Sequence, residues 1–284
     1  MKRIPIILAL FSCSVAVCAQ EVTFKKIFRQ DYSCEKGYGI QGAASFGNKF
    51  FQFHEGNPAI VVYSLPDGRV LDEIVTDRVK TWHNNTADFS TKYFSTGDKY
   101  PLLYASQENI NEHKALVYRI LDKNGKLSLE TVQTIVFPEP LHMGLYYPNI
   151  AVDPEGRYIY LTGFSRNSYG DPRFGNGVQI LRFRLPSIEE GETVCLGTAD
   201  IQERYCTEFK EATQGATVKD GKLYQVFGGP GDSCLVCTDL SSGAEVFKSQ
   251  LNGIPGEPEG LGFYEGHLVV SCNEGDVFIS EATF

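Results

Sequence analysis

The sequence predicts an all-β protein, a five-bladed β-propeller with four antiparallel strands in each blade. A strand–turn–strand pattern that returns five times along the chain leads to this prediction, as do the glycine-containing turns inside the pattern. The composition agrees, because 42% of the 284 residues are hydrophobic and they include 19 Phe, 15 Tyr and 28 Gly. Aromatic side chains favour strands over helices.

The first residues have the layout of a secretory signal peptide. Lys2 and Arg3 precede an apolar stretch over residues 4–11, and a run of small residues ends at Ala19. Cleavage there would leave residues 20–284 as a single propeller domain, exported to the periplasm or the exterior. A lipoprotein signal with Cys13 as the lipidated residue fits less well, because Phe11 is a poor match at its position.

Charge and hydropathy exclude two classes of partner. Removing residues 1–19 takes away two positive charges and no negative ones, so the formal net charge moves from −9 to −11. The sequence has no long Lys/Arg run, which argues against nucleic acid as a partner. No segment approaches the roughly 20 apolar residues that a membrane-spanning helix needs.

Six cysteines follow the signal peptide, and an even number in an exported chain is compatible with disulfides. Cys195 and Cys206, eleven residues apart across a polar loop, are the expected pair. Cys234 and Cys237 have CxxC spacing, but they lie in a strand-like run without a second CxxC or a nearby His. We therefore expect these two to be buried apolar residues rather than a metal or redox site. The six are Cys34, Cys195, Cys206, Cys234, Cys237 and Cys272.

Four copies of the repeat share one spacing, with a polar first residue six positions before a glycine-containing turn. A fifth, looser copy begins near His83 and Asn84, with strands expected over 86–89 and 100–106. The turns of the four regular copies are Gly47-Asn48, Glu155-Gly156, Asp220-Gly221 and Glu265-Gly266.

Third and fourth strands follow in several copies, again across turns that contain glycine. They are expected over 60–64 and 70–74, over 115–120 and 129–136, and over 234–239 and 245–249. The Asp67-Gly68 and Asn124-Gly125 pairs supply the positive φ angles that tight hairpins require.

The last copy, residues 259–284, is long enough for three strands only, whereas residues 21–28 form a strand-like run ahead of the first copy. We expect this N-terminal strand to complete the last blade and remove an exposed edge. A β-sandwich is the main alternative, but it does not explain the fixed six-residue spacing. A sixth blade hidden in residues 165–213 is a further alternative.

In a propeller, the innermost strands line a central channel, and their first residues gather at one mouth. The repeat places polar, mostly amide-bearing side chains there, which predicts a ring of hydrogen-bonding groups. The alternative is that these side chains only satisfy backbone groups and channel water. Gly42, Gly215 and Gly260 are expected to let innermost backbones approach closely. The predicted ligand-binding residues are Gln41, His83, Asn84, Tyr147, Asn149, Gln214 and Glu259.

Glycoside hydrolysis needs two carboxyl groups, and the ring supplies only Glu259, with Glu257 or Asp88 as the candidates for a second. The chain resembles five-bladed arabinanases and levansucrases in architecture alone, because three of the places where they carry carboxylates are amides here. Calcium is conceivable, since amide oxygens and carboxylates can form its shell. His113 and His142 are expected in solvent-exposed loops. No serine-hydrolase, nucleotide-binding or zinc-protease motif is found.

Two motifs carry a resemblance to a known group of proteins. The Gln-Gly start of the copies at Gln41 and Gln214, and the Glu-Pro-Glu-Gly-Leu run around Glu259, resemble secreted five-bladed propellers of Bacteroides-type bacteria. More remotely, they resemble the propellers of phage-baseplate and teichoic-acid-associated proteins. The resemblance implies an exported protein that meets glycans or cell-wall polymers, and it assigns no catalytic residue.

The leading hypothesis is an exported, monomeric propeller that binds a glycan or another small polar ligand at the channel mouth. The second is a hydrolase or lyase acting on a glycan or phosphodiester, with Glu259 as base or metal ligand and His83 as its partner in proton transfer. The third is a protein-interaction scaffold. No cofactor is assigned, and calcium is the one candidate.

Overall fold

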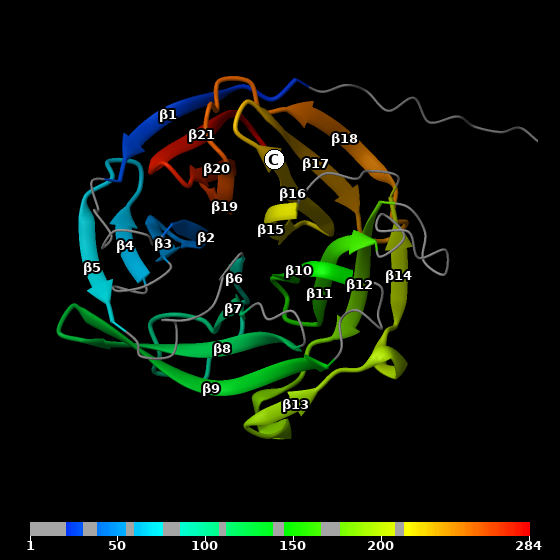
Figure 1. The fold of residues 1–284 in the computed structure, drawn as a ribbon. Coiled ribbons are helices and arrows are strands. Elements are labelled where there is room, and N and C mark those ends of the chain that lie inside the picture. Colours follow the sequence, from blue (N-terminus) through cyan, green and yellow to red (C-terminus); the bar gives the residue numbers. More distant parts are fainter. Residues whose placement is uncertain are drawn as a thin grey trace, which may run out of the picture.

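The structure is a computed structural model that describes residues 21–30, 39–54, 60–75, 86–107, 112–138, 145–165, 177–207 and 213–284. Their strands form five sheets arranged in a ring around a central axis (Figure 1). This is the predicted five-bladed β-propeller. Within the described ranges no helix is long and apolar enough to cross a membrane.

Each blade adds its strands from the centre outward, and successive strands pair antiparallel. Blade 1 contains β2 (Ile40–Phe46), β3 (Lys49–His54), β4 (Ile60–Ser64) and β5 (Val70–Ile74). Blade 2 contains β6 (Ala87–Phe89), β7 (Leu103–Gln107), β8 (Glu112–Lys123) and β9 (Lys126–Pro138). Blade 3 contains β10 (Leu145–Val152), β11 (Tyr158–Ser165), β12 (Val178–Arg184) and β14 (Glu203–Cys206). Blade 4 contains β15 (Thr213–Lys219), β16 (Lys222–Gly229), β17 (Asp232–Asp239) and β18 (Glu245–Gln250). Blade 5 contains β19 (Pro258–Tyr264), β20 (His267–Cys272), β21 (Asp276–Thr283) and β1 (Phe24–Arg29).

The N-terminal strand closes the ring, as predicted. Strand β1 pairs antiparallel with β21, from Phe24 opposite Ser280 to Arg29 opposite Asp276. Val22 and Phe24 are buried in the apolar cluster between blades 4 and 5. Both ends of the described chain therefore contribute strands to one blade, and blade 5 has no unpaired outer edge on β21.

The described part of the stretch after β11, residues 177–207, supplies β12 and β14 of blade 3 and one further strand of blade 2, and it builds no sixth blade. Strand β13 (Thr193–Cys195) pairs parallel with β9 as the fifth strand of blade 2, and β14 then returns to blade 3. Cys195 and Cys206 consequently lie in different sheets, and both are exposed and are not joined by a disulfide. The expected disulfide between them is wrong, because the loop that separates them passes from one blade to the next.

The other described cysteines belong to the core. Cys234, Cys237 and Cys272 are buried, and no disulfide joins them to one another. Burial raises the pKa of Cys237 to about 11 and that of Cys272 to about 12, so both thiols are protonated at neutral pH. The expectation that the CxxC pair serves as buried apolar residues is confirmed. Cys34 lies outside the described residues.

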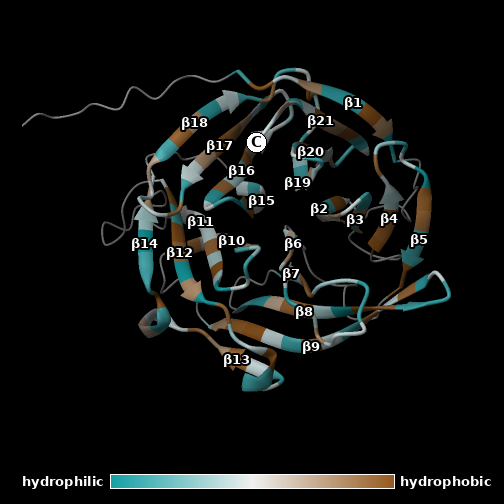
Figure 2. Ribbon diagram, turned by 180° about the vertical axis from the view of Figure 1, so that it is seen from behind, coloured by the Kyte–Doolittle hydropathy of each residue, from teal (hydrophilic) through white to brown (hydrophobic). Residues whose placement is uncertain are grey.

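The hydrophobic core consists of separate layers between neighbouring blades. Phe51 and Phe53 of β3, for example, share a cluster with Leu103 and Tyr118 of blade 2. The closing layer joins Phe50 of blade 1 to Val269 and Ile279 of blade 5, among others. Figure 2 shows the hydrophobic stretches on the strands, whereas the outer strand β14 is mostly hydrophilic. Blade-to-blade packing thus fixes where the innermost strands lie.

Candidate binding site at the channel mouth

Strands β2, β6, β10, β15 and β19 are the innermost strands and surround the centre of the ring (Figure 1). Four predicted residues lie on these strands: Gln41, Gln214 and Glu259 are the second residues of β2, β15 and β19, as predicted, and Asn149 lies within β10. Gln41, Asn149 and Glu259 are buried and Gln214 is partly buried. We call this end of the ring the channel mouth. The binding role of these residues stays a prediction.

Three predicted site residues are not placed by the structure in side-chain detail. His83 and Asn84 lie outside the described residues. Tyr147 is part of β10, but only its backbone is described.

The predicted residues coincide with irregularities in strand pairing. Ile40 lies opposite His54 and Ala43 opposite Gln52, so two residues, Gln41 and Gly42, face a single residue of β3. The same two-against-one arrangement occurs at Gln214-Gly215 in β15 and just before Asn149 in β10, and the pairing also shifts at Glu259. Such bulges bend a strand and re-aim its side chains. The four regular copies of the repeat therefore coincide with a distortion of their innermost strand at the mouth, whereas the described pairing of β6 with β7 has no such shift.

Glycines next to these residues allow close backbone approach. A Cβ atom on Gly260 would lie 2.6 Å from the Cβ of Ala43 and 2.9 Å from its backbone nitrogen. A Cβ atom on Gly215 would lie 2.9 Å from the carbonyl oxygen of Glu259. Strand β19 thus fits closely against β2, and β15 against β19, only because these positions lack a side chain. The expected role of Gly215 and Gly260 is confirmed.

A chain of polar contacts joins three blades at the mouth. Asn149 Nδ2 donates to the carbonyl oxygen of Gln214 at 2.6 Å, and Gln214 Nε2 donates to Glu257 Oε1 at 2.7 Å. Asn273 Nδ2 donates to the second carboxylate oxygen of Glu257 at 2.9 Å. The Glu257 carboxylate therefore fixes the side-chain amide of Gln214, and the main-chain carbonyl of Gln214 fixes the amide of Asn149.

Other buried polar atoms near the mouth have no hydrogen-bond partner among the described residues. These atoms belong to residues of β2, β10, β15 and β20. Three of the residues lie at the end of their strand nearest the mouth, and the one on β10 lies within its strand. In native proteins most buried polar groups form hydrogen bonds, so a buried group without a protein partner is a candidate to bind an ion, a water or a ligand. Two of these groups are amide oxygens, which only accept, and two are hydroxyls, which accept and donate. The atoms are Gln41 Oε1, Asn149 Oδ1, Thr213 Oγ1 and Ser271 Oγ.

Gln52 supports the mouth from the second strand of blade 1. Its Nε2 donates to the carbonyl oxygens of Gln41 at 2.5 Å and Gly42 at 3.1 Å, and its Oε1 accepts from Gln30 Nε2 at 3.1 Å. Sequence analysis missed this residue, although a signal exists. Gln225 follows Gln214 at the same distance of eleven residues at which Gln52 follows Gln41.

Two histidines are buried without exposure to solvent. Burial lowers the pKa of His54 to about 4 and that of His113 to about 3, so both rings are neutral at physiological pH. His113 lies on β8, with its ring 6.1 Å from that of Phe137. The expectation of a solvated His113 is wrong, because β8 begins three residues earlier than the predicted strand. His142 lies outside the described residues.

Asp88 joins three innermost strands. It lies on β6, where Oδ1 accepts from Thr217 Oγ1 of β15 at 3.2 Å and Oδ2 accepts from the backbone N–H of Val152 of β10 at 3.3 Å. Burial raises its pKa to about 7. Because Val152 ends β10 and Thr217 lies three residues after Gln214, Asp88 lies farther from the mouth than the amides. Asp88 therefore joins strands of the channel wall through hydrogen bonds.

The described part of the chain holds no group of three or more His, Cys, Asp or Glu side chains placed to bind a metal ion. Among the described residues, the mouth offers amide and hydroxyl oxygens together with the carboxylates of Glu257 and Glu259. Such a set suits hydrogen-bonded recognition of a polar molecule.

No family model matches the chain, and no curated protein matches it. Solved structures do share its fold. The chain is similar to a glutaminyl cyclase of Myxococcus xanthus, with a TM-score of 0.52 and 8% identity over 93% of this chain and 98% of that one. It is also similar to a PQQ-bound aldose sugar dehydrogenase of Streptomyces coelicolor, with a TM-score of 0.50 and 11% identity over 92% of this chain and 98% of that one. Both similar proteins are enzymes by name, and at these identities the likeness shows the propeller fold alone.

Proposed function

We propose that the protein binds a hydroxyl-rich ligand, such as an oligosaccharide, at the channel mouth. The observation that carries this proposal is a set of four buried polar atoms, on Gln41, Asn149, Thr213 and Ser271, that have no hydrogen-bond partner within the described part of the chain. Sugar hydroxyls can donate to the two amide oxygens and exchange hydrogen bonds with the two side-chain hydroxyls. Binding would satisfy groups that otherwise lower the stability of the fold.

We infer an exported, monomeric protein whose mature chain begins at Gln20, as in the secreted propellers of Bacteroides-type bacteria that the sequence resembles. Support comes from the layout of residues 1–19 and from the Gln-Gly starts of β2 and β15. Detection of residues 20–284 in the periplasmic fraction or the medium tests this part.

The unpartnered hydroxyls give a sharp test of the mouth. Thr213→Val keeps the side-chain shape, and Ser271→Ala removes only the hydroxyl, so neither variant breaks a hydrogen bond within the described protein. Both should leave the thermal stability of the free protein equal or higher, yet weaken ligand binding. Gln250→Ala, an exposed change on β18, is the control.

The measurement is a thermal-shift screen of residues 20–284 against oligosaccharides, phosphodiesters, calcium and a chelator, followed by calorimetry on the ligand that raises the melting temperature. A ligand whose affinity falls in both variants but not in Gln250→Ala supports the proposal. A ligand that binds both variants as tightly as the parent protein contradicts it.

The same screen separates the alternatives. A shift with calcium that the chelator reverses would indicate a metal at the amide oxygens. Turnover of a glycan or phosphodiester that Glu259→Gln abolishes would indicate acid–base chemistry, in which His83 is the proposed partner. If no compound in the panel raises the melting temperature, the result would favour a protein-interaction scaffold.

A further inference from the structure

The connection between β6 and β7 presents two exposed aromatic side chains. Tyr93 is 46% exposed and Phe94 is 39% exposed, and the other large hydrophobic side chains left exposed in the described ranges are valines. This connection, residues 90–102, follows the end of an innermost strand. It therefore lies on the face of the propeller opposite the channel mouth.

The loop is held in place by main-chain and charged contacts. The backbone N–H of Thr91 donates to the carbonyl oxygen of Pro154 at 2.7 Å, and that of Leu102 donates to the carbonyl oxygen of Lys92 at 2.7 Å. The Arg119 guanidinium lies 4.7 Å from the centre of the Phe94 ring and forms a forked ion pair with Asp98 at 2.8–3.1 Å. An aromatic surface that is fixed before binding loses little entropy when a ligand arrives.

Three hollows meet at Phe94. We call the first of them, of about 340 Å³, the aromatic groove, and it lies between this loop and the segment after β12. A hollow of about 500 Å³ lies along the loop, and one of about 420 Å³ lies beside β9. Each is large enough for a sugar unit. The aromatic groove is lined by Lys92, Tyr93, Phe94, Leu102, Tyr104, Gly156 and residues 184–189.

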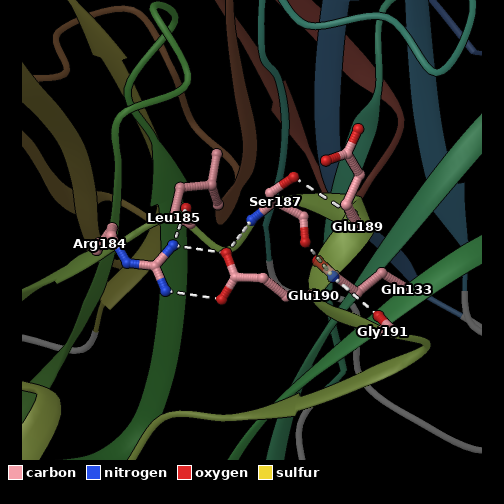
Figure 3. Close-up of polar contacts among 7 residues, drawn as sticks. All are labelled: Gln133, Arg184, Leu185, Ser187, Glu189, Glu190 and Gly191. Atoms are coloured by element: carbon pink, nitrogen blue, oxygen red, sulfur yellow. Dashed lines mark hydrogen bonds and ion pairs between the residues drawn. The ribbon is translucent and has the colours of Figure 1, made fainter.

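The opposite wall of the groove is also held rigidly. Arg184 pairs with both oxygens of Glu190 at 2.6 and 2.7 Å, and the same carboxylate accepts from the backbone N–H of Ser187 at 2.7 Å (Figure 3). Gln133 Nε2 donates to the carbonyl oxygen of Ser187 at 2.8 Å. In Figure 3 the carboxylate of Glu189 points away from this network.

Polar groups without partners face these hollows. The Lys92 ammonium and the Glu189 carboxylate, both on the lining of the aromatic groove, form no ion pair with any described residue. Gln133 is 1% exposed and lines the hollow beside β9, and its Oε1 has no hydrogen-bond partner among the described residues. The aromatic groove therefore combines an aromatic surface with a cation and an anion that form no ion pair with a described residue, and the neighbouring hollow beside β9 adds a buried acceptor.

We propose that the aromatic groove is a second ligand site, separate from the channel mouth, which binds a neutral oligosaccharide. A sugar ring has an apolar C–H face that packs on Tyr93 or Phe94, and a hydroxyl edge that can donate to Glu189 and accept from Lys92. The opposite charges of these two side chains give no preference for an ionic ligand. A chain of sugar units can continue along Phe94 into the hollow that contains Gln133.

The test is calorimetry of the mature protein with cellohexaose, laminarihexaose and maltohexaose at millimolar concentration. At least one should bind, and Phe94→Ala should weaken its binding by about tenfold or more. Glu189→Gln, an exposed change that keeps the side-chain shape, should weaken it several-fold. Val246→Ala removes an apolar side chain that is also 39% exposed, on β18, and should have no effect.

A mouth variant separates this site from the proposed function. Binding that survives Ser271→Ala but is weakened by Phe94→Ala supports the groove, whatever happens at the mouth. Binding that is lost in Ser271→Ala and unchanged in Phe94→Ala overturns the groove and leaves the mouth in place. Absence of binding by all three hexasaccharides also overturns the groove proposal.

Discussion

At the scale of single residues, Asp88 links stability to pH. Its carboxyl group has a folded-state pKa of about 7 against an ordinary value of 3.8, because burial opposes the charged form. Its contribution to stability is therefore fully present below about pH 4 and is lost as the pH rises to about 7. Between pH 5 and pH 8 this group lowers the free energy of unfolding.

Asp88→Asn removes that titration. We expect the free energy of unfolding of the parent protein to fall more between pH 5 and pH 8 than that of the variant. Urea denaturation at the two pH values measures the difference. The buried histidines titrate in both proteins and cancel in the comparison. Equal pH dependence in the two proteins would show that Asp88 is ionised throughout this range.

His113 has the opposite pH dependence. Its pKa is lowered from 6.5 to about 3, so the stability that the neutral ring contributes is present above pH 6.5 and is lost as the pH falls towards 3. Both ring nitrogens are buried and unpartnered among the described residues. His113→Leu should therefore raise the free energy of unfolding at pH 5 by about 2 kcal/mol more than at pH 8. Denaturation curves of parent and variant that shift in parallel would contradict this.

At the scale of elements, Gly260 sets the distance between two innermost strands. A methyl group there would meet Ser271 Oγ at 2.4 Å and the Cβ of Ala43 at 2.6 Å, so Gly260→Ala should cost about 1–3 kcal/mol of stability. Gly97→Ala is the matched control, because nothing lies within 4 Å of the added atom. Chemical denaturation of both variants measures the difference. A Gly260→Ala protein as stable as the control would mean that β19 can move away from β2.

The elements differ in how well the sequence alone predicts them. The innermost strands with regular turns are predictable, because the six-residue spacing and turns such as Asp220-Gly221 depend only on local backbone geometry. Strand β13 is not predictable, because its three residues form a strand only where β9 offers a free edge. The loop that carries Phe94 has no counterpart in the other copies of the repeat, so periodicity gives it no assigned role.

In the candidate site too, the sequence predicts some features, whereas others depend on contacts between blades. The repeat predicts that Gln41 and Gln214 lie on innermost strands at the mouth, and they do. It does not predict that Gln214 bonds Glu257, because that contact depends on the distance between two blades. It also leaves out Ser271, whose position follows from pairing with Gly260 rather than from its own sequence neighbours.

At the scale of the whole molecule, the ring depends on β1. A chain that begins at residue 31 lacks β1 and the buried side chains of Val22 and Phe24. We expect it to unfold at lower urea concentration than residues 20–284, with a broader transition, and to aggregate through the freed edge of β21. Denaturation and size-exclusion chromatography measure both effects.

A synthetic peptide of residues 20–30 should restore the transition, whereas a scrambled peptide should not. An unchanged transition in the shortened chain would show that the other strands close the ring by themselves.

The pairing of β1 with β21 also imposes an order on biosynthesis. The ribosome makes Phe24 before all four of the other blades and its partner Ser280 after them, so β1 has to wait until β21 has been made before it can pair. The blades between them can stack one after another as they emerge, but the seam of blade 5 forms only after β21 has been made. A nascent chain that stops before β21 therefore leaves the same seam open as a chain that has lost β1.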